Sequence, residues 1–169
     1  MASPIHAELV FYQAPRDGAP PFNHVEEPPL GEPWRNYHND IRTVPIHDIR
    51  GKEDQYTLDR DALQILKNVA SSTTYETFNS DDAIRNLYYP EVERLLLETV
   101  PGAHRIIFFD HTIRRANPRA MRQPVNQVHA DQTEYSAQSR VRNHVSDPDL
   151  AEKYLSQRYR IINVWRPIN

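Results

Sequence analysis

The sequence predicts an α+β fold in a single domain, with helices flanking a set of strands and an extended Pro-rich arm at the N-terminus. Three observations predict this class. The prolines, 14 in all, are concentrated in the first third of the chain. Apolar residues recur at helical spacing between residues 59 and 103, and β-branched and aromatic residues dominate several segments after residue 104. A chain of 169 residues is the size of one domain that can bury a core.

The first expected element is the arm, which we place over residues 1–50. Its centre, residues 13–34, reads QAPRDGAPPFNHVEEPPLGEPW and is polar, rich in proline and without periodicity. Such a segment is typical of an extended chain laid over a surface. A disordered linker is equally compatible with this composition.

Residues 51–103 are expected to be mainly helical. In residues 59–72, apolar side chains follow helical spacing after an aspartate that could cap a helix. Residues 81–103 show the same spacing and predict a short helix that breaks into a longer one. Pro90 suits the first turn of the longer helix, and Pro101-Gly102 suits its end.

Residues 104–169 are expected to hold strands and one helix. Strands are predicted at residues 104–115, 125–131 and 159–168, where β-branched and aromatic residues are frequent. The helix is predicted over residues 149–158, after the capping pair Asp147-Pro148.

Composition excludes several classes of site and partner. There is no cysteine, so disulfides, zinc–thiolate sites and iron–sulfur clusters are excluded, and any metal must be held by nitrogen and oxygen. A formal net charge of −3 argues against nucleic acid as the principal partner. No apolar run approaches the ~20 residues that cross a bilayer, and the N-terminus lacks a signal peptide. We therefore expect a cytoplasmic protein with no membrane and no nucleic acid partner.

The candidate metal ligands are His129 and Asp131, in the triplet His-Ala-Asp. On a strand, residues i and i+2 point to the same face, which would place an imidazole beside a carboxylate. The triplet alone is weak, because eight histidines in this chain yield about 0.6 such triplets by chance. A second triplet, His38-Asn39-Asp40, is interpreted as a surface or loop pair. For His129 and Asp131, a structural ion pair remains the alternative.

Two further groups have structural interpretations. Asp110 and His111 are expected to form an acid–imidazole pair that holds their strand, since the chain has neither a G-x-S-x-G elbow nor a cysteine nucleophile. Five arginines form a local positive cluster that is expected to pair with surface acids: Arg105, Arg114, Arg115, Arg119 and Arg122.

Six blocks together resemble the fungal AsaB-like hydroxylase/desaturase family, which includes gibberellin desaturase-like enzymes. In chain order they are DIRGKEDQYTLDRDA, YYPEVERLL, FFDHTIRR, RQPVNQVHADQT, SRVRNHV and RYRIINVWRP. The resemblance covers nearly the whole chain. It implies a non-haem Fe(II)/2-oxoglutarate oxygenase whose fold is a partial double-stranded β-helix, similar to a jelly roll. It also implies an oxidoreductase that hydroxylates or desaturates a small-molecule secondary metabolite.

The resemblance also implies the cofactors Fe(II) and 2-oxoglutarate, with His129 and Asp131 as the first two ligands of a facial triad. Asn163 and Trp165 share one face of the last predicted strand and could line the barrel beside the iron, but core packing and hydrogen bonding explain them equally well. Arg140 is a candidate for contact with an anionic ligand. Arg142 is a similar candidate, with Asp147 and Glu152 as acids that could neutralise both arginines. No catalytic residue is assigned.

Family members continue past the NVWRP block, and that stretch carries the distal histidine and the residue that anchors 2-oxoglutarate. The chain is therefore expected to be the N-terminal part of an oxygenase fold. The alternatives are a catalytically inactive remnant or binding partner, or one half of a split oxygenase. His144 is a less favoured substitute for the third ligand. Because the last predicted strand lacks a neighbour, self-association or a complementing polypeptide is also expected.

Overall fold

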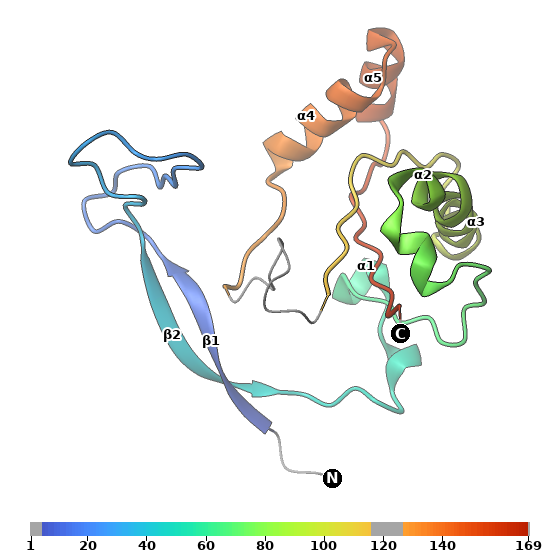
Figure 1. Cartoon of the computed structure of the whole chain (residues 1–169), viewed down its shortest axis with the longest axis horizontal. Helices are drawn as coiled ribbons and strands as arrows, with labels where there is room; N and C mark the ends of the chain where they lie inside the picture. The colour runs from blue at the N-terminus through green and yellow to red at the C-terminus, as the bar shows by residue number, and fades with distance from the viewer. Residues whose placement is uncertain (1–4, 116–126, 169) are drawn as a thin grey trace. The chain divides into compact units, whose positions relative to one another are not determined.

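The computed structural model describes residues 5–115 and 127–168 (Figure 1). It contains a small antiparallel sheet and several helices, which confirms the predicted α+β class at this level. The chain divides into two compact units. The first comprises residues 1–65 and 123–131, and the second comprises residues 66–122 and 132–169.

The first unit is built on two antiparallel strands, β1 (Ile5–Gln13) and β2 (His38–Ile46) (Figure 1). Their register pairs Ile5 with Ile46 at one end and Gln13 with His38 at the other. Directly paired residues share a face, so Leu9, Phe11 and Val44 lie on the same face as Arg42 and Asp40. The guanidinium of Arg42 lies 5.6 Å from the centroid of the Phe11 ring. None of the unit's described residues is fully buried.

This hairpin corrects the extended arm expected over residues 1–50. The Pro-rich stretch instead lies in the connection between the strands. There the backbone N–H of His24 donates to the carbonyl of Trp34 at 2.9 Å, and the side-chain oxygen of Asn36 accepts from the N–H of Phe22 at 2.8 Å. The prolines stand where no ladder hydrogen bond is required, while the flanking β-branched and aromatic residues form the strands.

The rest of the first unit is irregular, with a 3₁₀ turn η1 (Glu53–Gln55) and a single helical turn α1 (Leu58–Asp61). The side chain of Thr57 caps α1 by accepting from the N–H of Arg60. The turn ends at Ala62, whose φ of 54° is left-handed. The helix predicted over residues 59–72 is therefore wrong. The apolar residues continue at helical spacing, but the helical backbone ends at Ala62.

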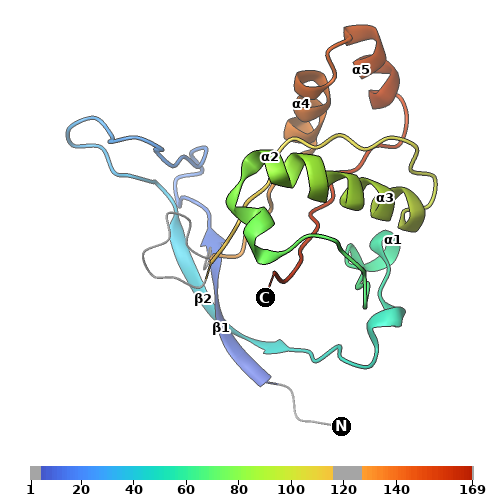
Figure 2. The ribbon, with the colours of Figure 1, turned by 45° about the vertical axis from the view of Figure 1, so that its right-hand side comes forward.

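The second unit contains a nearly continuous helical run (Figure 2). It consists of η2 (Tyr75–Asn79), α2 (Asp81–Ala83), the π-helical turn η3 (Ile84–Tyr88) and α3 (Tyr89–Thr99). The side chain of Ser80 caps α2, and Pro90 occupies the first turn of α3. These bounds confirm the predicted short helix followed by a longer one. In η3 the N–H of Tyr89 donates to the carbonyl of Ile84, five residues earlier.

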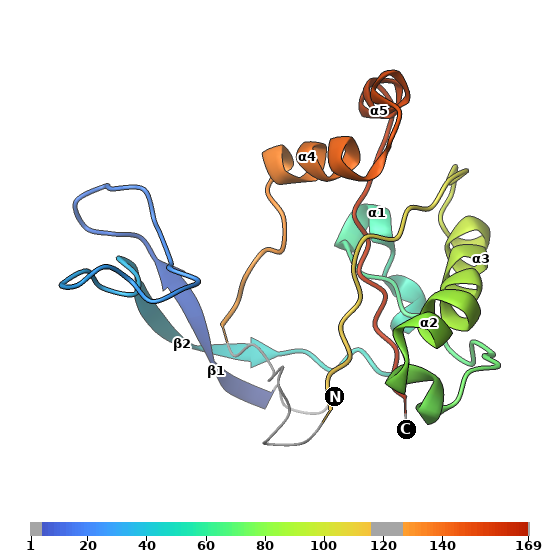
Figure 3. The same cartoon turned by 45° about the horizontal axis from the view of Figure 1, so that its top comes forward.

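Two further helices of this unit follow, α4 (Glu134–His144) and α5 (Pro148–Leu155) (Figure 3). Helix α5 confirms the prediction at this position: the Asp147 carboxylate accepts from the N–H groups of Asp149 and Leu150, and Pro148 opens the helix. Helix α4 was not predicted, although Thr133 and Ser136 form a capping box at its start.

The strands predicted at residues 104–115 and 159–168 are not formed. In both segments the described residues have no regular secondary structure, although many of their side chains are half-buried. Of the strand predicted at residues 125–131, Gln127 makes one isolated parallel bridge to Val10, and residues 125–126 lie outside the described residues. A strand needs a hydrogen-bonding neighbour as well as a suitable composition, and composition does not reveal whether that neighbour exists.

Within residues 5–115 and 127–168, the buried hydrophobic residues all belong to the second unit: Phe78, Ile84, Val92, Val100, Val145 and Ala151. Phe78 also meets Tyr88 edge to face, with ring centroids 5.1 Å apart. Around this core, the carboxylate of Glu91 accepts hydrogen bonds from the hydroxyl of Ser71 at 2.5 Å and from the backbone N–H and hydroxyl of Ser72 at 2.7 Å each. Glu91 thus joins the first turn of α3 to the preceding loop.

Candidate metal centre

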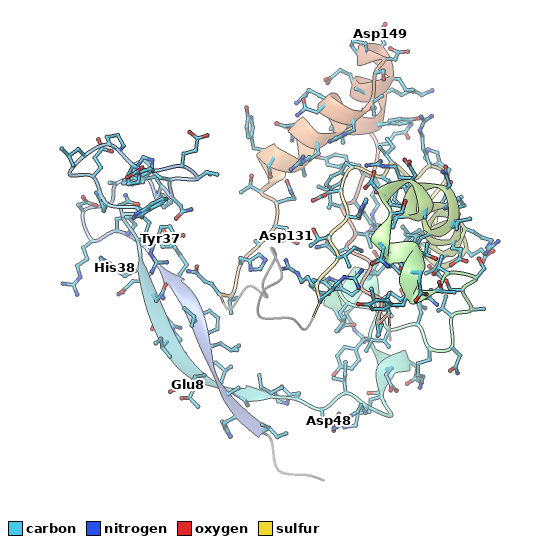
Figure 4. All side chains as sticks on the ribbon, in the orientation of Figure 1. Glu8, Tyr37, His38, Asp48, Asp131 and Asp149 are labelled. Atoms are coloured by element: carbon cyan, nitrogen blue, oxygen red, sulfur yellow. The ribbon has the colours of Figure 1, made fainter. Side chains whose placement is uncertain are left out.

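The segment that carries His129 and Asp131 belongs to the first unit and is held by β1. The backbone N–H of Val128 donates to the carbonyl of Val10 at 2.8 Å, and Gln127 forms the isolated parallel bridge with the same residue. Val10 lies in the middle of β1, whose β-branched and aromatic residues favour an extended backbone. These two contacts fix the backbone immediately before His129. Figure 4 labels Asp131 at the end of this segment.

The side chains of His129 and Asp131 converge. The His129 Nε2 atom lies 3.1 Å from the Asp131 Oδ1 atom, and the two side chains are equally exposed, at 51% each. The other ring nitrogen of His129, Nδ1, lies 2.8 Å from the backbone carbonyl oxygen of Gln127. The side-by-side placement expected from the i, i+2 spacing is therefore present, although the segment is not a regular strand.

The hydrogen bond at Nδ1 determines what the other ring nitrogen can do. A carbonyl oxygen only accepts, so Nδ1 must carry the hydrogen. In the neutral ring, Nε2 then presents a lone pair toward a carboxylate oxygen, and two lone pairs at 3.1 Å repel each other. Either a hydrogen on Nε2 or a cation that both atoms ligate removes this repulsion. A histidine that donates its second N–H to a backbone carbonyl is also the usual arrangement of a metal ligand.

The donor pair fits two neighbouring ligands of Fe(II). Imidazole nitrogen and carboxylate oxygen are the ligand types of a facial triad. Two ligands at right angles, each about 2.1 Å from a metal, are roughly 3.0 Å apart, close to the separation of these two atoms. Among the residues that the structure describes, however, no group of three or more His, Asp or Glu side chains is placed to hold an ion. The pair therefore supplies part of a coordination sphere, and its role as a metal site stays a prediction.

The second His-x-Asp triplet has a different environment. His38, Asn39 and Asp40 lie on β2 rather than in a loop, and His38 and Asn39 are exposed. Of the surface or loop placement expected for this triplet, the surface placement is confirmed. The Asp40 carboxylate is bound by Arg42, with Nε at 2.7 Å and a terminal guanidinium nitrogen at 2.5 Å from Oδ2. The Asp40 carboxylate has an arginine partner on its own strand, and the Asp131 carboxylate lies beside the His129 imidazole. The two triplets form a natural pair for comparison.

The other candidate residues, Asn163, Trp165 and Arg140, belong to the second unit. Asn163 and Trp165 are exposed, Trp165 at 79%, and they lie in the segment that forms no strand. Arg140 lies on α4 with its guanidinium 5.1 Å from the centroid of the Phe109 ring. Their proposed part in holding a cofactor stays a prediction.

Neighbouring candidates on α4 have structural partners. Arg142 binds the Glu152 carboxylate of α5, with Nε 2.7 Å from Oε1, as expected for a neutralising acid. This contact lowers the pKa of Glu152 and raises the pKa of Arg142 through the hydrogen bond that they share. Asp147, the other acid considered for this role, caps α5 instead. The ring of His144 stacks on Phe109 with centroids 5.4 Å apart.

A second cluster of polar side chains, centred on His111 in the second unit, was not predicted from the sequence. His111 was expected to pair with its neighbour Asp110, but its Nε2 lies 3.0 Å from the Asp81 carboxylate, and its Nδ1 lies 2.7 Å from the hydroxyl of Tyr89. Asp81 also binds Arg85 at 2.6 Å, and this hydrogen bond lowers the pKa of Asp81. Burial raises the pKa of Tyr89. No signal local to residue 111 could have found partners some 20 to 30 residues earlier.

The arginine cluster also departs from expectation, because two of its members lie over tyrosine rings. The guanidinium of Arg105 lies 5.7 Å from the Tyr154 ring centroid, and that of Arg115 lies 4.5 Å from the Tyr75 ring centroid. Arg115 additionally donates to the side-chain oxygen of Asn79 at 2.5 Å. Arg119 and Arg122 lie outside the described residues.

A family model described as an oxidoreductase/YMDC permease-like domain matches residues 9–169. Among curated proteins, the hydroxylase/desaturase poxK of Penicillium oxalicum is 35% identical over 146 residues, which are 84% of this chain and 45% of that protein. The Fe(II)/2-oxoglutarate-dependent dioxygenase nvfI of Aspergillus novofumigatus is 25% identical over 166 residues, which are 96% of this chain and 59% of that protein. The chain thus spans about half the length of these curated relatives.

A solved structure of the iron and alpha-ketoglutarate-dependent endoperoxidase NvfI is similar to this chain with a TM-score of 0.74. The sequences are 21% identical, and the match covers 90% of this chain and 55% of the other. A likeness at this identity establishes a shared fold over the matched part. Within the described residues, no helix combines the length and apolar character that a membrane span requires.

Proposed function

Since the chain belongs to the oxidoreductase/YMDC permease-like family, together with fungal hydroxylase/desaturase relatives, we propose that it forms the iron-binding N-terminal part of an Fe(II)/2-oxoglutarate oxygenase. The proposed reaction is the hydroxylation or desaturation of a small-molecule secondary metabolite. The jelly-roll-like double-stranded β-helix implied by the resemblance is part of this proposal. So is a cytoplasmic location.

The observation that carries the proposal is the geometry of His129 and Asp131. The Gln127 carbonyl oxygen lies at hydrogen-bond distance from Nδ1 of His129, and Nε2 of the same ring lies 3.1 Å from a carboxylate oxygen of Asp131. Bound Fe(II) with 2-oxoglutarate supplies oxidation of an unactivated carbon by dioxygen. The chain's own contribution is to present two of the ligands at a fixed separation on a segment bound to β1. Asn163, Trp165 and Arg140 are proposed to contact cosubstrate or substrate.

A second candidate function is supported by the ligand count. Because no third ligand side chain joins the pair among the described residues, the chain could instead be one half of a split oxygenase, or a binding protein without oxygenase activity. In the split case a second polypeptide would supply the distal histidine. Metal binding with only two protein ligands is expected to be weak, since water replaces the missing ligand poorly.

The test is Fe(II) binding under anaerobic conditions and 2-oxoglutarate consumption by the purified chain. We expect His129→Ala and Asp131→Asn each to reduce Fe(II) affinity by at least about tenfold, as loss of a ligand does. The matched control is His38→Ala, in the other His-x-Asp triplet, which should leave Fe(II) binding unchanged. Fe(II) binding that is equal in wild type and His129→Ala would contradict the proposed site. Binding that depends on His129 without 2-oxoglutarate consumption would favour the split or non-catalytic alternative.

A further inference from the structure

The outer edge of β2 presents backbone hydrogen-bonding groups in a known direction. Among the described residues, β2 pairs with β1 alone. The Val10 carbonyl accepts from Val128, so it points away from β2, and Val10 stands directly opposite Ile41. In an antiparallel ladder both members of such a pair point outward, so the N–H and C=O of Ile41 face the outer edge.

The position of Pro45 independently supports this direction. Pro45 lies four residues after Ile41, so its backbone groups also face the outer edge. Because proline has no N–H, it could not donate a hydrogen bond to β1. A proline is tolerated in a strand where its nitrogen faces outward. Asn39 and Thr43 lie two residues on either side of Ile41 and therefore also turn their backbone groups to the outer edge.

The side chains along this edge are complementary to those of a second copy of the same edge. If a second copy of β2 pairs antiparallel to the first with Ile41 at the centre, Ile41 stands opposite Ile41 of the other copy. Asp40 then stands opposite Arg42, and Asn39 stands opposite Thr43, each pair occurring twice. Ile41 is 62% exposed and lies on the face opposite to Asp40 and Arg42, so it is available for a cross-strand apolar contact.

The charges of Asp40 and Arg42 favour the register centred on Ile41 over the registers centred one residue earlier or later. Asp40 and Arg42 already bind each other within one strand, and pairing centred on Ile41 would join two such pairs into a ring of alternating charges. Pairing centred one residue earlier places Asp40 opposite Asp40, and one residue later places Arg42 opposite Arg42. Like charges directly opposite each other are unfavourable, whereas opposite charges stabilise a strand pair.

We propose that β2 is a dimerisation edge, where two copies of the chain pair antiparallel with Ile41 on the two-fold axis. The interface is isologous, because each copy contributes the same residues. Self-association was expected from the sequence at residues 159–168, and the structure assigns it to a different segment. The inference goes beyond the proposed function and does not depend on bound iron.

The test is the molar mass of the full chain in solution over a range of concentrations, from sedimentation velocity or light scattering after size exclusion. We expect a dimer for the wild type and a monomer for Ile41→Lys, which places two ammonium groups together on the axis. Far-UV circular dichroism should be unchanged, because the Ile41 side chain is exposed. A wild type that is monomeric throughout, or an Ile41→Lys variant that associates as tightly, would overturn the proposal.

Exchanging the charges of Asp40 and Arg42 tests the register of the proposed dimer separately. Arg42→Asp places two like pairs across the interface and should weaken the dimer by about tenfold or more. The double variant Asp40→Arg/Arg42→Asp restores opposite charges and should recover the dimer. Failure to recover it, in a folded double variant, would overturn the register. The matched control is Val164→Lys, in residues 159–168: loss of the dimer in this variant but not in Ile41→Lys would place the interface there instead.

Discussion

The two units of the chain differ in how their structure is held together. The second unit contains every fully buried hydrophobic residue among the described parts of the chain, and these residues lie in its helical segments or directly after them. The first unit contains none, and its order comes from a two-stranded ladder and the bonds that residues 127 and 128 make to it. A two-stranded sheet without a core is only marginally stable in water.

This difference matters because the candidate metal ligands belong to the unit without a core. His129 and Asp131 are placed by backbone contacts to β1 rather than by packing around them. The proposed site should therefore depend on anything that further orders the first unit, including a bound ion or a second copy at β2. Substitutions placed in each unit can measure how far the two units differ in their contribution to the free energy of unfolding.

The largest effect is expected from Ile84→Ala in the second unit. Ile84 is 3% exposed, so the truncation leaves a cavity and should lower the free energy of unfolding by about 2–5 kcal/mol. The matched change in the first unit is Ile46→Ala, at a residue 42% exposed, which should cost less than about 1 kcal/mol. Urea unfolding followed by circular dichroism measures both. A cost for Ile46→Ala equal to that of Ile84→Ala would remove the distinction between the units.

Glu91→Gln should have the next largest effect. Burial would raise the pKa of Glu91, but hydrogen bonds from Ser71 and Ser72 outweigh it, so the pKa is lowered in the folded chain. The stabilisation is therefore present above the ordinary pKa of a glutamate and disappears as the pH falls through the lower folded value. We expect a cost of about 1–2 kcal/mol at neutral pH.

Unfolding measured as a function of pH checks this expectation. The wild type and Glu91→Gln should converge in acid, below the ordinary glutamate range. Glu93→Gln, two residues further along α3 and exposed, is the control and should track the wild type. A difference between wild type and Glu91→Gln that stays constant with pH would mean that the carboxylate charge is not what stabilises the loop.

Local signals explain which parts of the fold could be predicted. The helical run from Asp81 to Thr99 and helix α5 carry proline and capping residues at their starts, and both were predicted. The helix over residues 59–72 failed because Ala62 and Asn68 adopt left-handed backbones, with φ of 54° and 56°, that apolar spacing does not reveal. The capping box of α4 was available in the sequence and was overlooked.

Non-local pairing explains most of the remaining differences. The β1–β2 hairpin joins strands across a long Pro-rich connection, and nothing within that connection specifies their register. At the candidate site, the i, i+2 spacing predicted that His129 and Asp131 would lie side by side. The contact from Gln127 to His129 is local, but the bond from Val128 to Val10 depends on a strand more than a hundred residues earlier and could not be read locally.

Asp147→Ala should have a moderate effect, confined to the second unit. The Asp147 carboxylate accepts from two backbone N–H groups at the start of α5, and loss of such a cap costs about 1 kcal/mol. Hydrogen exchange should show faster exchange of the first-turn amides of α5 and unchanged exchange in β1. Asp147→Asn, which preserves a capping oxygen, should lie close to the wild type.

The smallest effect is expected for Asp48→Asn, in the first unit. Its hydrogen bonds with Arg50 lower the pKa of Asp48 to about 2, yet both side chains are exposed to solvent, Arg50 at 85% and Asp48 at 50%. Exposed ion pairs contribute little to stability and are screened by salt. We expect no measurable change in the urea midpoint. A clear destabilisation would show that this pair is protected from solvent in the folded chain.

The π-helical turn η3 has a consequence for insertions and deletions. The wide turn accommodates one residue more than an α-helix would, and it separates Tyr88, which meets Phe78, from Tyr89, which stacks on Phe108. Deleting a single residue here would convert the turn to ordinary helix and leave the faces of α3 in place. The same deletion within α3 would instead rotate every later residue of the helix by roughly 100° about the axis. Within this helical run, chain length is therefore less tightly constrained at η3 than in α3.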